Sequence, residues 1–209
     1  MAQGVGWYSE KVLPRLIKVA CTGKPTQKQR EKIVPLASGD VLEIGFGGGL
    51  NLPFYDSSKV RKVWGLEPSA GMRESAAEMV NESPLDVELI DLPGEHIPLE
   101  DNSVDTVLVT YTLCSIAEVH DALDGMRRVL KPGGSLLFCE HGKAPDEGVQ
   151  RWQNRLNGPW SRVSGGCNMN RDVPALLERS GFSVVEDNRM YIPGLRILCY
   201  NYWGVAKIT

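Results

Sequence analysis

Residues 41–49 are the segment whose residue types and spacing are best suited to chemistry. They read Val-Leu-Glu-Ile-Gly-Phe-Gly-Gly-Gly, a short apolar strand that runs into a glycine-rich turn, with Glu43 inside the strand. The next strand-like run ends on a second acid, Glu67. Glycines let a backbone approach a ligand closely, and an acid at a strand end can accept hydrogen bonds from two ribose hydroxyls. The pattern therefore predicts a site for a cofactor that contains a nucleoside.

The spacing of the glycines narrows the class of cofactor. A dinucleotide-binding turn requires Gly-x-Gly-x-x-Gly, but the third position here is Leu50. A P-loop requires Gly-Lys-Ser/Thr, which does not follow this turn. Glu43 has no role in the dinucleotide fingerprint. The pattern Glu-x-Gly-x-Gly-x-Gly instead favours a ligand with a zwitterionic amino-acid end beside Gly45 and Gly47 and a nucleoside end beside Glu67.

Strands and helices alternate around these residues, as expected for an α/β fold. Ser69 is a suitable helix N-cap, and Ser115 to Glu118 has the pattern of a capping box. The expected strands are 40–45, 61–67, 86–90, 104–110, 135–139, 182–190 and 196–207. The expected helices are 7–22, 26–36, 69–80, 172–180 and one that the capping box opens and that ends before Lys131. This order predicts a doubly wound, seven-stranded and mostly parallel sheet with helices on both faces and an antiparallel hairpin at one edge.

The composition is that of a soluble globular protein, and its 209 residues suit one domain. We expect a helical lid at 1–36, a cofactor-binding core at 37–142, and a substrate-facing cap with the edge hairpin at 143–209. The net charge of −3 gives no reason to expect nucleic-acid binding. The five cysteines show no metal-ligand spacing, so no metal site is expected. We expect these cysteines to be reduced thiols in a cytoplasmic protein.

Four motifs in order resemble those of the class I S-adenosylmethionine-dependent methyltransferases. They are Val41 to Gly49, the acid Glu67, the segment 94–105 that leads into the fourth strand, and Arg128-Val129-Leu130-Lys131-Pro132-Gly133-Gly134 before the fifth. The resemblance implies a Rossmann-like methyltransferase fold and S-adenosyl-L-methionine as cofactor, with S-adenosyl-L-homocysteine as product. The cofactor-binding residues that it implies are Glu43, Gly45, Phe46, Gly47, Gly49, Asn51, Glu67, Pro68, Ser69, Met72, Pro93, Gly94, Glu95, Thr110, Tyr111 and Leu113.

A narrower resemblance is to the alkyl-thiol methyltransferases of animals, the methyltransferase-like 7 group. It is carried by Leu113-Cys114-Ser115, Glu140-His141, Trp152-Gln153, Gly166 to Arg171 and the ending Tyr202 to Lys207. This likeness implies S-methylation of a small thiol. Two features depart from it: the amphipathic helix 7–22 stands where the animal proteins have a hydrophobic anchor, and Pro93 stands where many class I enzymes place an Asp that contacts adenine.

The acceptor side of the site is less defined by the sequence. His141 follows the fifth strand and is the candidate general base, although direct methyl transfer to a thiol needs only a weak one. Cys114, which follows the fourth strand, is a candidate substrate-binding residue. So are Trp152, Trp160 and Asn168, because they lie in a segment of irregular pattern at 146–170, and such a segment in an α/β domain often forms a substrate-facing cap.

Several alternatives stay open at this point. The four motifs report the methyl donor, so an O-, N- or C-methyltransferase for a lipid, a quinone or another small amphiphile is the second reading. A non-catalytic cofactor-binding module is the third. Helix 7–22 is a lid over the pocket, a weak contact with the inner membrane surface, or a helix that simply packs on the domain. The expected partner is a small-molecule acceptor, and the chain is expected as a monomer or a homodimer.

Overall fold

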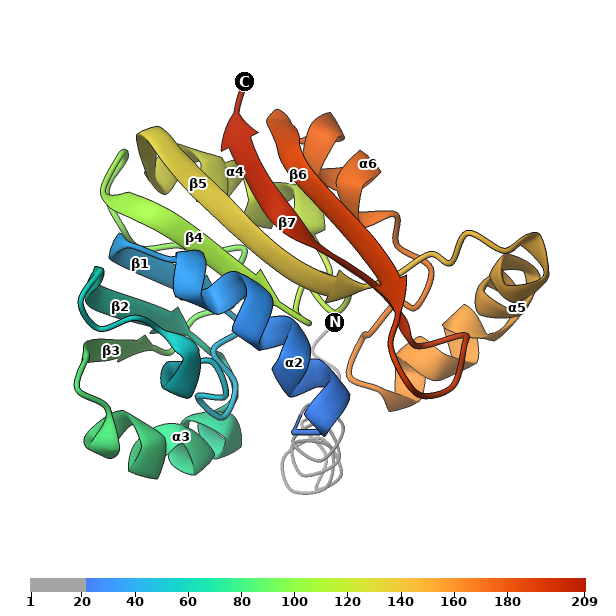
Figure 1. Cartoon of the computed structure of the whole chain (residues 1–209), viewed down its shortest axis with the longest axis horizontal. Coiled ribbons are helices and arrows are strands. Elements are labelled where there is room, and N and C mark those ends of the chain that lie inside the picture. Colours follow the sequence, from blue (N-terminus) through green and yellow to red (C-terminus); the bar gives the residue numbers. More distant parts are fainter. Residues whose placement is uncertain (1–21) are drawn as a thin grey trace.

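A computed structural model describes residues 22–209, which build one seven-stranded sheet (Figure 1). The order across the sheet is β3-β2-β1-β4-β5-β7-β6, and every neighbouring pair is parallel except the two that involve β7. The strands are β1 (Gly39–Ile44), β2 (Val60–Leu66), β3 (Asp86–Ile90), β4 (Val104–Thr110), β5 (Leu130–His141), β6 (Phe182–Tyr191) and β7 (Tyr200–Ile208). The predicted fold class is therefore confirmed, including the antiparallel hairpin at the edge.

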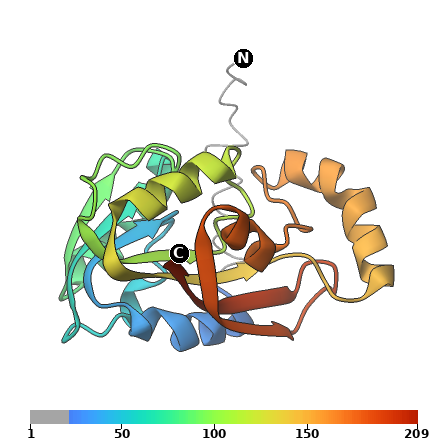
Figure 2. The same ribbon diagram turned by 90° about the horizontal axis from the view of Figure 1, so that it is seen from above.

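Helices cover both faces of this sheet, which Figure 2 shows nearly edge-on. The helices are α2 (Lys24–Ile33), α3 (Ala70–Glu82), α4 (Val119–Val129), α5 (Glu147–Val163) and α6 (Val173–Arg179), with short 3-10 turns at Val34–Leu36 and Leu52–Phe54. Side chains of α4 and α6 share one apolar core with one face of the sheet, and side chains of α2 and α3 share a second core with the other face. Expected helix 7–22 lies outside the described residues. No helix within 22–209 is long and apolar enough to cross a bilayer.

Successive residues of the central strands alternate between the two cores. Leu42 and Ile44 of β1 pack on the side of α4, whereas Val41 packs on the side of α2. In β4, Val107 packs on the side of α4 and Leu108 packs on the side of α2. Strands covered on both faces are apolar almost throughout, and the β-branched residues of β4 suit that environment. The sheet is thus a rigid support for the loops at its carboxyl end.

Three local predictions need correction. Ser115 does not cap a helix: α4 begins at Val119, with Glu118 at the N-cap and no side-chain cap hydrogen bond. β5 begins at Leu130 rather than Ser135, because Leu130 already pairs with Val104. The segment 146–170 is not irregular, since most of it is helix α5, whose one buried residue is Gln153. Its apolar residues recur at intervals of three or four residues, Val149, Trp152, Leu156, Trp160 and Val163, a helical periodicity that the sequence interpretation overlooked.

Other local predictions are confirmed. Ser69 caps α3, and its Oγ accepts a hydrogen bond from the backbone N–H of Met72 at 3.4 Å. The helix before β5 ends just before the Lys131–Gly134 segment. The second strand of the edge hairpin is real but begins at Tyr200, after a turn that occupies the first part of the expected strand.

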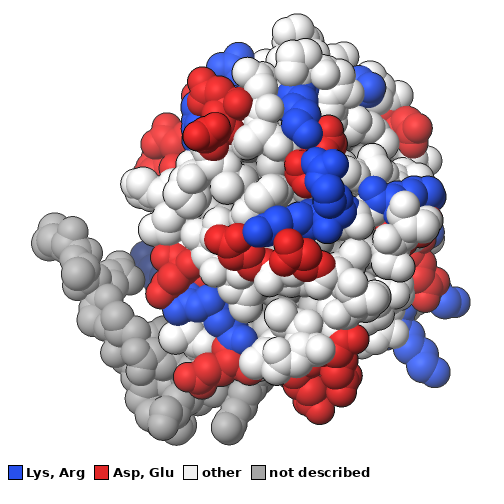
Figure 3. All heavy atoms as spheres, turned by 90° about the vertical axis from the view of Figure 1, so that its left-hand side faces the viewer, with Lys and Arg blue, Asp and Glu red and all other residues white. Residues whose placement is uncertain are grey.

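Ion pairs between acidic and basic side chains are common beside β1, β2 and β3. Arg61 pairs with Asp40, and Arg73 pairs with Asp91 at 2.6 Å. The molecular face in Figure 3 accordingly shows acidic and basic side chains interspersed, with no large region of one sign. A nucleic-acid surface needs a concentration of positive charge. The expectation that the chain binds no nucleic acid stays a prediction.

Candidate active site

A cavity of about 430 Å³ opens at the carboxyl ends of β1, β2 and β4. β1 and β4 are neighbours in the sheet, but the chain runs from β1 outward to β3 and only then returns to β4. Ligands in doubly wound sheets bind at such a reversal of strand order, because the loops diverge there. The lining residues are Arg30, Ile44, Gly45, Phe46, Gly47, Gly48, Leu50, Asn51, Leu66, Glu67, Pro68, Ser69, Met72, Pro93, Gly94, Glu95, Thr110, Tyr111, Thr112, Ser115, Ile116, Ala117 and Gly165.

The glycine-rich turn brings the backbone to the cavity wall in a conformation that other residues resist. Gly45 has φ +71° and Gly47 has φ +58°. A Cβ atom on Gly45 would lie 2.3 Å from Oγ1 of Thr112, and one on Gly47 would lie 3.3 Å from Cε of Met72. Both positions therefore need glycine for backbone conformation, and Gly45 also for space. This gives a physical reason for two of the glycines singled out in the sequence.

Glu67 lies at the tip of β2 and faces the turn. Its Oε2 accepts the backbone N–H of Gly47 at 2.9 Å, and its Oε1 accepts that of Ser69, also at 2.9 Å. Burial raises the pKa of Glu67, and these two backbone hydrogen bonds oppose the rise. A carboxylate oxygen has two lone pairs, so each oxygen can still accept a ribose hydroxyl. The predicted role of Glu67 therefore fits its geometry.

Glu43 lies behind the cavity wall and not in it. It is fully buried, and it accepts hydrogen bonds from Tyr55 at 2.6 Å and from Nδ2 of Asn51 at 2.9 Å. Nδ2 of Asn51 also donates to Thr110, and its Oδ1 accepts from Nε of Arg30 at 3.0 Å. Burial raises the pKa of Glu43 to about 7, against the effect of these hydrogen bonds and of the Arg30 charge. Glu43 thus orients Asn51, and direct contact with a cofactor stays a prediction.

The loop after β4 is held in place from behind by Glu140 of β5. Its Oε1 accepts the backbone N–H groups of Thr112 at 2.7 Å and Leu113 at 3.0 Å. Burial raises the pKa of Glu140 to about 7, in opposition to these two hydrogen bonds. Tyr111, at the start of the loop, has φ +55°, which is rare outside glycine and marks a segment that its surroundings force into shape. The cavity wall after β4 is accordingly preorganised.

The segment 93–95 forms a further wall of the cavity. Gly94 packs against β1, and a Cβ there would lie 2.8 Å from Cγ2 of Ile44. Glu95 lines the cavity beside it. The segment therefore lines the cavity where adenine is expected, and its contact with the base stays a prediction.

Most of the predicted cofactor-binding residues meet at this cavity, with three exceptions. Glu43, Gly49 and Leu113 lie behind its lining. Sequence reasoning did not name several lining residues as cofactor-binding residues, namely Arg30, Ile44, Gly48, Leu50, Leu66, Thr112, Ser115, Ile116, Ala117 and Gly165. Arg30 had a detectable signal, because it shares a helix face with the core residues Ile33 and Val34. A charged side chain at a core-facing position of a helix is unusual unless it has a binding or structural role.

The predicted substrate-binding residues do not line the cavity. Trp152 is 55% exposed on α5, and Trp160 lies on the same helix. Asn168 fastens two loops together, because its Nδ2 donates to the backbone carbonyls of Cys114 at 3.0 Å and Gly166 at 2.8 Å. Contact of these three residues with a substrate stays a prediction.

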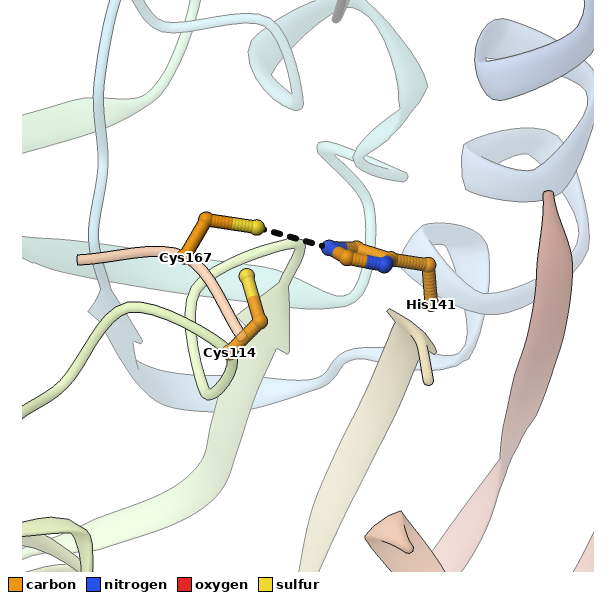
Figure 4. Close-up of side chains that lie close together, drawn as sticks. All are labelled: Cys114, His141 and Cys167. Atoms are coloured by element: carbon orange, nitrogen blue, oxygen red, sulfur yellow. Dashed lines mark hydrogen bonds between the residues drawn. The ribbon is translucent and has the colours of Figure 1, made fainter. Parts of the chain in front are cut away.

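Cys114, His141 and Cys167 come together beside this wall (Figure 4). Nε2 of His141 lies 3.2 Å from Sγ of Cys167. Burial would lower the pKa of His141, but the contact with Cys167 and the charge of Glu140 outweigh it and raise that pKa. The hydrogen bond with Cys114, followed by burial, raises the pKa of Cys167 well above its ordinary value. His141 does not line the cavity, and its role as a general base stays a prediction.

The cavity suits a ligand with a nucleoside at one end and an amino acid at the other. Glu67 and the segment 93–95 offer acceptors and packing for a ribose and a base. The buried Arg30 contributes a positive charge to the cavity wall. Gly45 and Gly47 also line the cavity, and without side chains they let the backbone of their turn approach a ligand. A volume of about 430 Å³ lies within the ordinary range for a small-molecule site. The residues present therefore fit S-adenosylmethionine.

Comparison with known proteins agrees with this geometry. Residues 42–138 match the methyltransferase domain family. The chain is 34% identical to the human thiol S-methyltransferase TMT1B over 163 residues, or 75% of this chain, and 34% identical to the rat protein over 151 residues, or 70% of this chain. It spans 66% of the human protein's length and 61% of the rat protein's.

A bacterial relative is covered more fully. The chain is 30% identical to the phosphatidylethanolamine N-methyltransferase of Cereibacter sphaeroides over 146 residues, which are 64% of this chain and 71% of that protein. Among solved structures, a SAM-dependent methyltransferase of Leishmania major superposes with a TM-score of 0.70 at 16% identity, over 96% of this chain and 80% of that one. The chain therefore belongs to the class I S-adenosylmethionine-dependent methyltransferases, with S-adenosylmethionine as cofactor.

Proposed function

We propose that the protein methylates a small thiol. The bound cofactor supplies a methyl group that its sulfonium sulfur makes electrophilic. The observation that carries the proposal is that, within the described chain, the cavity wall holds no side chain placed as a strong base. Of its ionisable residues, Arg30 is a cation, Glu67 is engaged by two backbone N–H groups, and burial raises the pKa of Tyr111 well above its ordinary value. Glu95 lies in the segment expected at the adenine end.

A thiol is the acceptor that needs the least catalytic help from a cavity wall without a placed base. The thiolate is the nucleophile, and a thiol with a pKa of about 8.5 ionises readily near neutral pH with water as the base. An alcohol or a protonated amine would need a placed base to remove its proton. What remains for the protein is to align two reactants, and alignment alone is worth on the order of 7–11 kcal/mol.

The chain's own residues supply that alignment. Glu67 and Asn51 are both fixed by hydrogen bonds before any ligand arrives, so they orient the cofactor without moving. Glu140 fixes the wall after β4, beside which the acceptor is expected. The identity of 34% with the rat and human thiol S-methyltransferases supports the same acceptor class.

A second candidate function is methylation of an amphiphilic acceptor such as a lipid headgroup or a quinone. The relative from Cereibacter sphaeroides is a phosphatidylethanolamine N-methyltransferase, and one from Campylobacter jejuni, 30% identical over 118 residues, is a ubiquinone/menaquinone biosynthesis C-methyltransferase. These similarities favour it, whereas the lack of a placed base in the described wall favours the thiol.

Separate reactions with different methyl acceptors distinguish the two functions. The chain is incubated with S-adenosylmethionine labelled in its methyl group and with an aliphatic thiol, a phenol, a quinol or vesicles containing phosphatidylethanolamine. We expect label in the thioether and not in the other products. Label in the phenol, quinol or lipid without label in the thiol would refute the proposal. Glu67→Gln should lose the activity, and the matched control Glu82→Gln, at an exposed position on α3, should keep it.

A further inference from the structure

Three side chains that bind soft metals meet beside the cofactor cavity. Cys114 follows β4, His141 ends β5, and Cys167 follows α5, so the three come from separate parts of the chain. Their ligand atoms all lie within 4.8 Å of one another, with Nε2 of His141 3.2 Å from Sγ of Cys167. Figure 4 shows the two thiols and the imidazole directed toward a common point. Because the ligands are far apart in the sequence, their spacing could not reveal the cluster.

The separations are close to those of a zinc site. Zn–S bonds of about 2.3 Å and Zn–N bonds of about 2.0–2.1 Å in a tetrahedron place two sulfurs about 3.8 Å apart and a sulfur and a nitrogen about 3.6 Å apart. The 3.2 Å between Nε2 of His141 and Sγ of Cys167 and the upper limit of 4.8 Å for every pair are compatible with these values after small side-chain adjustments. Two thiolates and an imidazole are a donor set that zinc favours.

Hydrogen bonds hold the cysteine-bearing loops in register. The backbone N–H of Asn168 donates to the carbonyl of Cys114 at 2.8 Å, which ties the loop of Cys167 to that of Cys114. Arg171 donates to the carbonyls of Leu113 and Ile116, on either side of Cys114. A site whose ligands are already positioned has less entropy to lose when it binds a metal. These hydrogen bonds position the two cysteine-bearing loops before any metal binds, as a binding site requires and an incidental contact between thiols does not.

The cluster adjoins the cavity rather than the interior. Cys114 is buried, whereas His141 and Cys167 keep partial exposure. Ser115 and Gly165, next to the two cysteines in the sequence, both line the cavity. Three protein ligands leave one tetrahedral position for an exchangeable ligand, as in catalytic rather than structural zinc sites.

We propose that Cys114, His141 and Cys167 bind a zinc ion whose fourth position takes an exogenous thiolate. On metal binding the two cysteine thiols each release a proton to solvent, the imidazole binds through its neutral Nε2, and no electron is transferred. A thiol that enters the fourth position releases a third proton and becomes a zinc thiolate. His141 is then a metal ligand and not a general base. The identity of the fourth ligand rests on the proposed function, whereas the metal site does not.

Metal binding is measured on the whole chain after reduction and removal of metals with a chelator. We expect calorimetry to give one zinc per chain with micromolar or tighter affinity and release of two protons. Cobalt(II) should give the visible bands of a tetrahedral site together with a thiolate-to-cobalt charge-transfer band. Cys167→Ser and His141→Gln should each weaken zinc binding by at least about tenfold, because each removes a ligand. Cys199→Ser, a matched change at a partly exposed cysteine of the β6–β7 turn, should not.

Several results would overturn the metal site. They are absence of zinc binding by the reduced wild-type chain, an equal loss of affinity in Cys199→Ser, or a Cys114–Cys167 disulfide together with no metal uptake after its reduction. Binding of S-adenosylmethionine, measured on every variant, distinguishes loss of a ligand from loss of the fold. The wild-type measurement decides the proposal even if a variant fails to fold.

Addition of an aliphatic thiol to the cobalt form tests the fourth position. We expect a second charge-transfer contribution, and its absence would overturn the thiolate ligand. Thiol methylation at full rate by a chain that binds no zinc would refute the metal site and leave the proposed function intact. Zinc binding in a chain that methylates only phenols or phosphatidylethanolamine would refute the proposed function and leave the metal site intact.

Discussion

Replacement of Glu43 by Gln should change how the stability of the fold depends on pH. Burial raises the pKa of this carboxyl from its ordinary value of 4.5 to about 7 in the folded chain. The folded state therefore binds the proton more tightly than the unfolded state, and stability must fall as pH rises from about 4.5 through about 7. At about 1.4 kcal/mol per pH unit, the difference between the two values corresponds to a loss of about 3 kcal/mol. A Gln at this position cannot titrate and should not show that loss.

The assay is urea unfolding of the wild-type chain and Glu43→Gln at closely spaced pH values between 4 and 8. The free energy of unfolding of the wild type, minus that of the variant, should decrease by about 3 kcal/mol across this range. Glu140, whose pKa is also raised to about 7, titrates in both proteins and cancels in the difference. Any fixed cost of exchanging hydrogen bonds to Tyr55 and Asn51 shifts the difference by a constant and leaves its slope unchanged.

A pH-independent difference would refute this reasoning, because it would mean that Glu43 has the same pKa folded and unfolded. A difference that increases with pH would show that the carboxylate is stabilised in the fold, against the effect of burial. Glu82→Gln, at an exposed position, is the matched control and should give a flat difference.

Three further predictions concern the cavity. Glu67→Gln should raise the dissociation constant for S-adenosylmethionine at least about tenfold in calorimetry, because a charge-assisted acceptor is lost; equal binding by this variant and Glu82→Gln would contradict it. Gly45→Ala should lower the free energy of unfolding, measured in urea, by about 1–3 kcal/mol, because Gly45 has φ +71° and the new Cβ would come too close to Thr112. The control Gly148→Ala, on α5 with open space around it, should not be destabilising. Arg171→Met should speed hydrogen exchange in the loop after β4 about tenfold, since it removes charged hydrogen bonds to two carbonyls, and unchanged exchange would exclude that role.

The parts of the site that the sequence revealed are those built from neighbouring residues. Strand β1 and its turn form one continuous segment, and Glu67 follows directly on the next strand. Their chemistry is therefore visible as a motif with fixed spacing. Most of these residues do line the cavity. Glu43 shows the limit of this reasoning, because the sequence marks it as unusual but cannot show that it lies behind the cavity lining, hydrogen-bonded to the lining residue Asn51.

The parts that the sequence did not reveal depend on packing between distant segments. Gly165 joins the cavity wall because Asn168 binds the carbonyl of Cys114. Helix α5 was not predicted although Val149, Trp152, Trp160 and Val163 recur at helical spacing, and that periodicity does not reveal what the helix contacts. Spacing along the chain contains no information about such contacts.

The position of β7 has a consequence for the order of folding during synthesis. β7 lies between β5 and β6, although it follows both in the sequence. While the ribosome adds residues to the chain, β5 presents an open edge and β6 has no neighbour with which to pair. Only when Tyr200 to Ile208 have emerged can both strands be joined to the sheet. The cofactor half can assemble early, but until then the nascent chain exposes a strand edge that is prone to mispairing with other chains.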